Sequence, residues 1–196
     1  ASAVTSVNGS VSEISALYAA NDITGLGNEA VSLSETISVA NANTISALTT
    51  GAVTATLSTG AIGSFESLAG TGNAYNISFT DTSNVSASAL TALAEKTTNN
   101  IDAAAVTSVI GTSSQISELL NQGNFNLSSL STLNVSNDAT SDASNLVSLL
   151  ASEIAIDASS LTSISGSVSD LSTLYAANDI TGLGNEAISF ASALSV

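Results

Sequence analysis

The stretch Asn21-Asp-Ile-Thr-Gly-Leu-Gly-Asn-Glu29 occurs twice in the chain, because the same nine residues return at Asn178–Glu186. The match extends well beyond them: of the 30 positions from Val4 to Leu33, 22 are identical to those from Leu161 to Phe190, at an offset of 157 residues. Internal repetition of this kind indicates stacked structural units rather than a globule with a single centre. The two 30-residue segments are called here the N-terminal repeat and the C-terminal repeat.

A short amphipathic helix is expected seven times along the chain, because two apolar residues three positions apart recur at intervals of 20 to 31 residues. The pairs are Ile14 and Leu17, Ile45 and Leu48, Phe65 and Leu68, Leu90 and Leu93, Ile116 and Leu119, Leu146 and Leu149, and Leu171 and Leu174. Six intervals fill one period of 157 residues, so one coil has roughly 26 residues. The seventh coil is the first one returning.

Between the helices, apolar residues alternate with Ser, Thr or Asn, which predicts strands with one face inward. These stretches are Ala30–Ser34, Ala52–Leu57, Ala74–Phe79, Leu130–Val135, Ile154–Ile156 and Ala187–Phe190, with further pieces directly before a helix at Val4–Val7, Thr36–Val39, Val106–Val109 and Leu161–Ile164. Strands joined by a helical crossover pair in parallel. The predicted fold is therefore an α/β solenoid of about seven coils, each a short helix plus one or two parallel strands, in a single repeat domain over residues 1–196.

Three helix starts carry the pattern of a capping box, in which a hydroxyl and a side chain three residues later bond each other's backbone N–H groups. They are Ser10 with Glu13, Thr112 with Gln115, and Ser167 with Asp170, of which the Asp version is the weaker form. The helices are expected to be short, about ten residues, and marginally stable in isolation.

Composition excludes several functions. The only basic residue is Lys96, against 16 acids and a net charge of −15, so nucleic acid is excluded as a partner. The chain has no His or Cys, which excludes Ser-His-Asp or Cys-His catalysis and the usual zinc, copper, haem and iron–sulfur sites. Ser and Thr interrupt every apolar run, so no transmembrane segment is expected.

Both end layers of the predicted solenoid lack the polar cap that soluble repeat proteins use. The chain opens almost directly on Val4–Val7, and its last residues, 188–196, carry no charge and no proline. Two interpretations remain open: one period of a longer repetitive protein, or copies that stack head to tail. In both, the main partner is another copy of the same repeat.

Calcium is the one cofactor that the acids suit, because a hard cation takes oxygen ligands. The candidate ligands are Asp22, Asn28 and Glu29, with their equivalents Asp179, Asn185 and Glu186. The spacing matches neither an EF-hand nor the nonapeptide of haemolysin-type calcium β-rolls. The alternative is a helix-to-strand turn in which Gly25 and Gly27 supply unusual dihedral angles and Asp22 or Asn28 caps backbone groups.

Two further functions stay as remote alternatives. The ladder Thr54-Ala-Thr56 suggests an ice-binding face, although rows of Thr do not recur at that position in other coils. Paired carboxylates for glycoside hydrolysis would make the protein carbohydrate-active, although no two acids are singled out and no Trp offers a sugar platform. The chain is therefore not expected to be an enzyme, and no catalytic residue is assigned.

Four stretches resemble the tandem-repeat regions of very large secreted surface proteins of marine cyanobacteria, which are described as adhesin-like or haemolysin-like. They are Thr50–Thr56, Gly70–Tyr75, Ala89–Leu93 and Ile23–Ala30. The resemblance implies an extracellular, cell-surface location and contact with a cell surface or its carbohydrates. The expected function is a structural or adhesive repeat protein that forms or extends a fibre by stacking of its open ends, with a calcium-stabilised surface module as the alternative.

Overall fold

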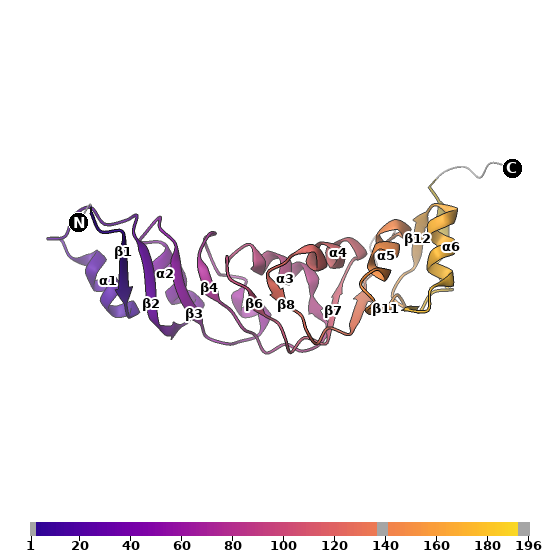
Figure 1. Cartoon of the computed structure of the whole chain (residues 1–196), viewed down its shortest axis with the longest axis horizontal. Helices are drawn as coiled ribbons and strands as arrows, with labels where there is room; N and C mark the ends of the chain where they lie inside the picture. Colours follow the sequence, from indigo (N-terminus) through magenta and orange to yellow (C-terminus); the bar gives the residue numbers. More distant parts are fainter. Residues whose placement is uncertain (1–2, 137–140, 192–196) are drawn as a thin grey trace. The chain divides into compact units, whose positions relative to one another are not determined.

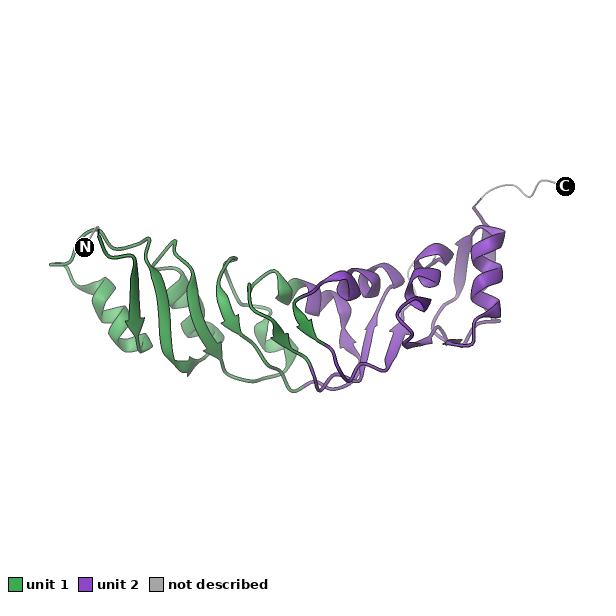
Figure 2. Ribbon diagram, in the orientation of Figure 1, with its two compact units in different colours: residues 1–80, 92–103, 124–126 green, residues 81–91, 104–123, 127–196 purple. Residues whose placement is uncertain are grey.

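The computed structural model describes residues 3–136 and 141–191, and in these residues the chain is an α/β protein with parallel sheets (Figure 1). It divides into two compact units, shown in Figure 2. Unit 1 comprises residues 1–80, 92–103 and 124–126, and unit 2 comprises residues 81–91, 104–123 and 127–196. A single repeat domain over the whole chain stays a prediction.

The α-helices of the described residues are short, with eight or nine residues each. They are α1 (Val11–Ala19), α2 (Val39–Ser46), α3 (Ala87–Ala94), α4 (Ser113–Asn121), α5 (Ala143–Leu150) and α6 (Val168–Ala176) (Figure 1). In α3 to α6 both members of each expected apolar pair are buried where they face the core, as are Ile14 in α1 and Ile45 in α2. Their partners differ: Leu17 is half-buried on α1, and Leu48 lies two residues after the end of α2 and is half-buried. The spacing of three therefore predicted the core face of α3 to α6 in full, and one core position in each of α1 and α2. None of these helices is long and apolar enough to cross a membrane.

The capping boxes at Ser10 and Thr112 are confirmed, and each contains both of its reciprocal hydrogen bonds. The Ser10 hydroxyl accepts from the N–H of Glu13, while Glu13 Oε2 accepts from the N–H of Ser10 at 2.8 Å. The Gln115 side chain accepts from the N–H of Thr112 at 3.0 Å in the same way. At the third helix start, the Ser167 hydroxyl accepts a hydrogen bond from the N–H of Asp170 at 3.1 Å. Asp170 stands where the other two boxes have the longer Glu or Gln side chain, so this is the weaker form of the capping box.

The helix expected around Phe65 and Leu68 is wrong, because the chain forms only a 3₁₀ turn, η1 (Ile62–Phe65), at this place. The residue before the turn, Ala61, has no side chain able to cap it, and Gly63 lies inside it. Glycine disfavours helix by about 1 kcal/mol relative to alanine, so a start without a cap does not propagate into an α-helix. Phe65 and Leu68 are nevertheless buried, so the apolar pair still belongs to the core.

The main sheet of unit 1 has four parallel strands in sequence order: β1 (Ser6–Gly9), β2 (Ala30–Ile37), β3 (Val53–Leu57) and β4 (Ala74–Asn76). A pair of two-residue strands, β6 (Ile101–Asp102) and β8 (Phe125–Asn126), is also parallel. Val7, Val31 and Val53 align across three strands, and the last two are fully buried. Their alignment makes the inner face of the sheet a row of small aliphatic side chains.

Two predicted strand pieces, Ala30–Ser34 and Thr36–Val39, form one element instead of two. Strand β2 runs on to Ile37 with a register shift between Ser32 and Thr36, and Val39 already begins α2. Because of this shift, both halves of β2 pair with β3. The interruption of the alternating pattern in the sequence is therefore a β-bulge or irregularity within one strand, and not a gap between two strands.

Unit 2 contains two sheets, again with all strands parallel. One sheet has the order β13 (Ile180–Thr181), β11 (Ala155–Asp157), β9 (Thr132–Val135), β7 (Ser108–Gly111) and β5 (Val85–Ser86), and the other has the order β10 (Ser141–Asp142), β12 (Ser163–Gly166) and β14 (Ala187–Phe190). The parallel pairing predicted from the helical crossovers is confirmed. The two-residue strands β5, β6, β8, β10 and β13 were not predicted, because two residues are too few for an alternating pattern.

The N-terminal and C-terminal repeats fold alike within their own units. Ser6 pairs with Ala30 in unit 1, and the equivalent Ser163 pairs with Ala187 in unit 2, in the same parallel register. Helices α1 and α6 begin and end at equivalent residues. The repeated sequence thus encodes one strand–helix–turn–strand module.

Candidate functional site

The repeated turn joins α1 to β2 in unit 1, and two glycines give it its path. Gly25 and Gly27 have φ angles of 79° and 130°, and the equivalent Gly182 and Gly184 have 83° and 123°. Side chains with a Cβ rarely adopt these angles, so both positions require glycine. The turn interpretation of the two glycines is confirmed, but the side chain that caps the backbone is neither that of Asp22 nor that of Asn28.

The side chain of Glu29 stabilises the turn by accepting hydrogen bonds from its backbone. Its carboxylate accepts hydrogen bonds from the N–H of Gly27 to Oε1 and Oε2 at 3.0 and 2.9 Å, and from the N–H of Asn28 to Oε2 at 3.1 Å. The hydroxyl of Tyr18, in the last turn of α1, donates to Oε1. Glu29 is only 1% exposed. The four residues form the Tyr18–Glu29 cluster, which ties the end of the helix to the start of the strand.

The cluster changes the pKa values of both Glu29 and Tyr18. Burial alone would raise the pKa of the Glu29 carboxyl, but the hydrogen bonds from the Tyr18 hydroxyl and from the backbone N–H groups together outweigh it and lower the pKa to about 2. Burial, followed by the hydrogen bond to Glu29, raises the pKa of Tyr18 to about 12. At neutral pH the cluster therefore holds an ionised carboxylate and a neutral phenol.

The C-terminal repeat builds the same cluster. Glu186 accepts from the N–H of Gly184 at 3.0 and 2.8 Å and from the N–H of Asn185 at 3.0 Å, and the Tyr175 hydroxyl donates to its Oε1. The surroundings differ, because Tyr175 is 48% exposed and Glu186 is half-buried. Sequence reasoning missed both tyrosines, although their exact recurrence eleven residues before the glutamate was a usable signal.

A second segment of unit 1 covers the N-terminal cluster. Thr49 Oγ1 donates to the Glu29 carbonyl at 2.7 Å, and the N–H of Thr50 donates to the Gly27 carbonyl at 2.8 Å. Gly51 packs so closely that a Cβ there would lie 2.3 Å from the Glu29 carbonyl oxygen. These contacts lead directly into β3, which pairs with β2.

The calcium ligands predicted from the sequence do not lie in one kind of environment. Asp22 and Asn28 are exposed, whereas the Glu29 carboxylate is buried and already accepts N–H and O–H donors; Asp179 and Asn185 are likewise exposed beside Glu186. Within residues 3–136 and 141–191, no three acidic side chains gather in a way that could hold a metal ion. A cation at Glu29 would have to displace the donors of the cluster. Calcium binding at these residues stays a prediction, and an unchanged melting temperature in a chelator would contradict it.

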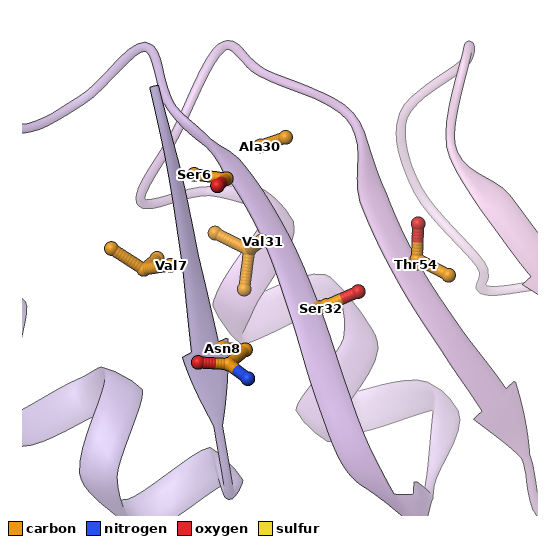
Figure 3. Close-up of a pocket in the computed structure, with 7 residues that line it drawn as sticks. All are labelled: Ser6, Val7, Asn8, Ala30, Val31, Ser32 and Thr54. Carbon is orange, nitrogen blue, oxygen red and sulfur yellow. The ribbon is translucent and has the colours of Figure 1, made fainter. Parts of the chain in front are cut away.

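A shallow cavity of about 350 Å³ lies along strands β1, β2 and β3 of the unit 1 sheet, and Figure 3 shows the residues that line it. It is lined by Ser6, Val7, Asn8, Ala30, Val31, Ser32 and Thr54. Asn8, Ser32 and Thr54 lie side by side in the strand register, and the next position along the row is Ala74. The row thus mixes amide, hydroxyl and methyl groups and contains a single threonine.

Polar side chains also bond to one another along the outside of this sheet. Asn76 Nδ2 donates to Thr56 Oγ1 at 3.4 Å, and Asn99 Nδ2 donates to Asn76 Oδ1 at 2.9 Å. Such a ladder repeats the direction of the backbone hydrogen bonds and resists sliding of one strand along the next.

No family model matches the chain, and comparison with curated proteins and with solved structures gives no match either. The resemblance to cyanobacterial surface-protein repeats therefore stays a prediction.

Proposed function

We propose that the chain is an α/β solenoid of about seven coils of roughly 26 residues, and that it serves as a structural or adhesive element outside a bacterial cell. In this proposal it forms or extends a fibre through contact between the β14 edge of one repeat and the β1 edge of another. The resemblance to the repeat regions of secreted cyanobacterial surface proteins supports the same location and role.

A mirrored pattern of exposure carries the proposal. In the C-terminal repeat, Ile188 on β14 is 40% exposed, whereas its equivalent in the N-terminal repeat, Val31, is 1% exposed on β2, which pairs with β3. In the N-terminal repeat, Ile23 is 39% exposed, whereas its equivalent, Ile180, is 8% exposed and pairs with β11. The N-terminal repeat is thus covered at Val31 and exposed at Ile23, and the C-terminal repeat is covered at Ile180 and exposed at Ile188. The position that is exposed in one repeat is covered in the other.

Each repeat also contributes an edge strand to a parallel sheet, β14 in the C-terminal repeat and β1 in the N-terminal repeat. Among the described residues, β14 pairs only with β12, and β1 pairs only with β2. Open edges with exposed apolar side chains are sites where another chain adds a strand. Joining β14 of one copy to β1 of the next as parallel strands is a heterologous contact, and such contacts build an open filament when successive rotations do not close into a ring.

Glycine at the end of β1 fits this contact. In the C-terminal repeat, a Cβ on Gly166 would lie 2.4 Å from Cβ of Ala143 in the preceding segment. At the equivalent Gly9, the three atoms nearest to such a Cβ belong to Glu13 and Ile14 of the same repeat, and the closest is Glu13 Oε2 at 3.0 Å. A neighbouring copy would pack against Gly9 in this proposal as Ala143 packs against Gly166.

Charge sets the conditions for assembly. Copies that each carry a net charge of −15 repel one another, and salt screens this repulsion beyond about 10 Å at 0.1 M. The uncharged β14 edge is a short-range contact that salt does not weaken. Assembly is therefore expected to increase with ionic strength, as suits a protein that works in salty water.

Electron microscopy and sedimentation of the purified chain at low and high salt test the proposal. Filaments or head-to-tail oligomers are expected at high salt, and Ile188→Asp is expected to abolish them. Ile110→Asp is the matched control, because Ile110 is 37% exposed on β7, a strand that is paired on both sides. Circular dichroism checks that both variants fold. A monomer at every salt and protein concentration, or equal assembly of both variants, would overturn the stacking of copies.

A further inference from the structure

The C-terminal repeat presents a surface whose covered form is visible elsewhere in the same chain. The β14 surface is defined here as the exposed side chains of Tyr175, Ile188 and Phe190 together with the backbone of Gly184 and Glu186. Its N-terminal equivalent is covered by a segment of unit 1 that runs from Thr49 to Leu57. The repeat therefore shows which kind of segment the β14 surface fits.

The covering segment binds first through backbone acceptors. Thr49 Oγ1 bonds the Glu29 carbonyl, and the N–H of Thr50 bonds the Gly27 carbonyl, with Thr50 Oγ1 also donating to the same oxygen at 3.2 Å. On the β14 surface, the equivalent acceptors are the carbonyls of Glu186 and Gly184. Within the described residues, neither carbonyl accepts a hydrogen bond from a following segment.

The same device appears a second time in unit 1, so it is not particular to one turn. Thr97 Oγ1 donates to the Tyr75 carbonyl at 2.7 Å, and the N–H of Thr98 donates to the Asn73 carbonyl at 2.8 Å. In both places the first threonine also accepts from the N–H two residues later, Gly51 in one case and Asn99 in the other. A Thr-Thr pair followed by Gly or Asn is thus a recurring way to dock one segment on the preceding one.

Shape makes the docking selective. At Gly51 a Cβ would lie 2.3 Å from the Glu29 carbonyl oxygen and 2.5 Å from its carbon, which are backbone atoms that cannot move aside. Beyond the glycine, Val53 pairs with Val31 and Thr54 with Ser32. The β14 surface has Ile188 and Ser189 at these two positions, so the apolar and polar places in the ladder are preserved.

Charge does not oppose this contact. The segment from Ala47 to Gly60 contains no charged residue, so it can approach an acidic protein without repulsion. Addition of an extended segment to an open sheet edge is an established mode of recognition, in which backbone hydrogen bonds give affinity and alternate side chains give specificity.

We infer that the β14 surface binds an extended segment with the pattern Thr-Thr-Gly-x-Val-x-x-x-Leu, that of residues 49–57, as an added parallel strand. The inference rests on the proposed function, because it names the next coil of the repeat as the partner of the open side. It also narrows that function, since it makes continuation by the repeat's own next coil the preferred contact of β14.

A labelled synthetic peptide of residues 47–60, added to the full chain, tests the inference by fluorescence anisotropy and by hydrogen exchange. Saturable binding is expected, with amide exchange slowed at Ala187–Phe190 and not at β1. A peptide with Gly51→Val is expected to bind at least tenfold more weakly, and one with Thr49→Val about threefold to tenfold more weakly, as the loss of one hydrogen bond predicts. In the chain, Ile188→Asp should abolish binding and Ile110→Asp should leave it unchanged.

An extended chain, in which residues 34–80 follow Phe190 directly, gives a second measurement that does not depend on the solubility of the peptide. The added segment is expected to slow amide exchange at Ile188 and Phe190 at least tenfold, and Gly51→Val within that added segment should restore fast exchange. Equal binding of the Gly51→Val peptide, or unchanged exchange at β14 in both experiments, would overturn the inference.

The outcomes separate this inference from the proposed function. Filaments from the unmodified chain without docking of the segment would leave the stacking of copies standing and sink the inference. Docking of the segment by a chain that never self-associates would support the inference and sink the stacking of separate copies.

Discussion

The hydroxyl of Tyr18, at the end of α1, donates a hydrogen bond to the carboxylate of Glu29, which directly precedes β2. The same bond joins Tyr175 to Glu186 in the C-terminal repeat. The helix and the strand of each module are thus fastened by one polar contact in addition to their apolar packing. Because the two clusters have the same sequence and different exposure, each serves as a control for the other.

Replacement of Tyr18 by Phe is expected to destabilise the N-terminal module by about 1.5–3 kcal/mol, because it removes a hydrogen bond to a buried charged group. Tyr175→Phe should cost less than about 1 kcal/mol, since solvent replaces the lost donor at an exposed site. Native-state hydrogen exchange of the β2 amides for the first variant, and of the β14 amides for the second, measures the two local opening free energies. Equal costs would show that burial does not set the strength of the bond.

Stability is expected to fall in acid through Glu29. The folded pKa of this carboxyl is about 2, below its ordinary value of 4.5, so the folded state binds the proton more weakly than the unfolded state does. The contribution is therefore complete above about pH 4.5 and is lost as the pH falls towards 2. Thermal melting between pH 7 and pH 2 measures it.

The variant Glu29→Gln should have a lower melting temperature at pH 7 and a shallower decline in acid. Some decline remains, because hydrogen bonds from Ser10 lower the pKa of Glu13, and hydrogen bonds from Ser159 lower that of Asp157. Identical acid slopes for the variant and the parent chain would mean that Glu29 is not held as a charged group.

Much of the fold could be predicted from local pattern. The three-residue spacing found most of the buried positions of the helices, and the helical crossovers predicted parallel pairing. Leu17 and Leu48, which the spacing also marked, are only half-buried. The capping boxes at Ser10 and Thr112 follow from two residue types at a fixed spacing, so they form wherever the helix forms. The predictions that failed concern features that depend on adjacent strands. Strand β2 is one such case, because it stays continuous across its register shift by pairing with β3 on both sides of the shift.

The candidate site was less predictable, because its chemistry depends on contacts between segments. The sequence predicts that the acids are cation ligands, yet the carboxylate of Glu29 accepts hydrogen bonds from N–H and O–H donors of its own module. Equal sequence also does not give equal burial. Ile23 and Ile180 occupy the same place in identical stretches, and only the segment packed against Ile180 buries it.

Replacement of Tyr75 by Phe is expected to stabilise the protein or leave it unchanged, within about 1–2 kcal/mol in the favourable direction. Within the described part of the chain, the buried hydroxyl of Tyr75 has no hydrogen-bond partner. Burial raises the pKa of Tyr75, and the nearby Ser46 hydroxyl acts in the opposite direction. A buried hydroxyl without a partner costs roughly 1–3 kcal/mol, and phenylalanine keeps the ring packing. Urea unfolding of both chains measures the change, and a clear loss of stability would reveal a hydrogen bond in solution.

Replacement of Gly166 by Ala is expected to cost about 1–3 kcal/mol, because the new methyl group overlaps the side chain of Ala143. Gly9→Ala at the equivalent position should change stability by less than about 1 kcal/mol, since the closest atom is the movable carboxylate of Glu13 at 3.0 Å and Ile14 Cδ1 lies at an ordinary contact distance of 3.7 Å. Urea unfolding measures both. The double variant Gly166→Ala with Ala143→Gly should regain most of the loss, because it moves the methyl group from one side of the contact to the other.

The same pair of variants separates stability from assembly. If another copy packs over Gly9 as Ala143 packs over Gly166, then Gly9→Ala should leave the monomer stable and reduce filament formation at high salt. The reason is steric: the contact at Gly166 leaves no room for a methyl group, and a copy stacked on β1 in the same way would leave none at Gly9. Undiminished filaments from Gly9→Ala would place the contact between copies elsewhere than on the edge of β1.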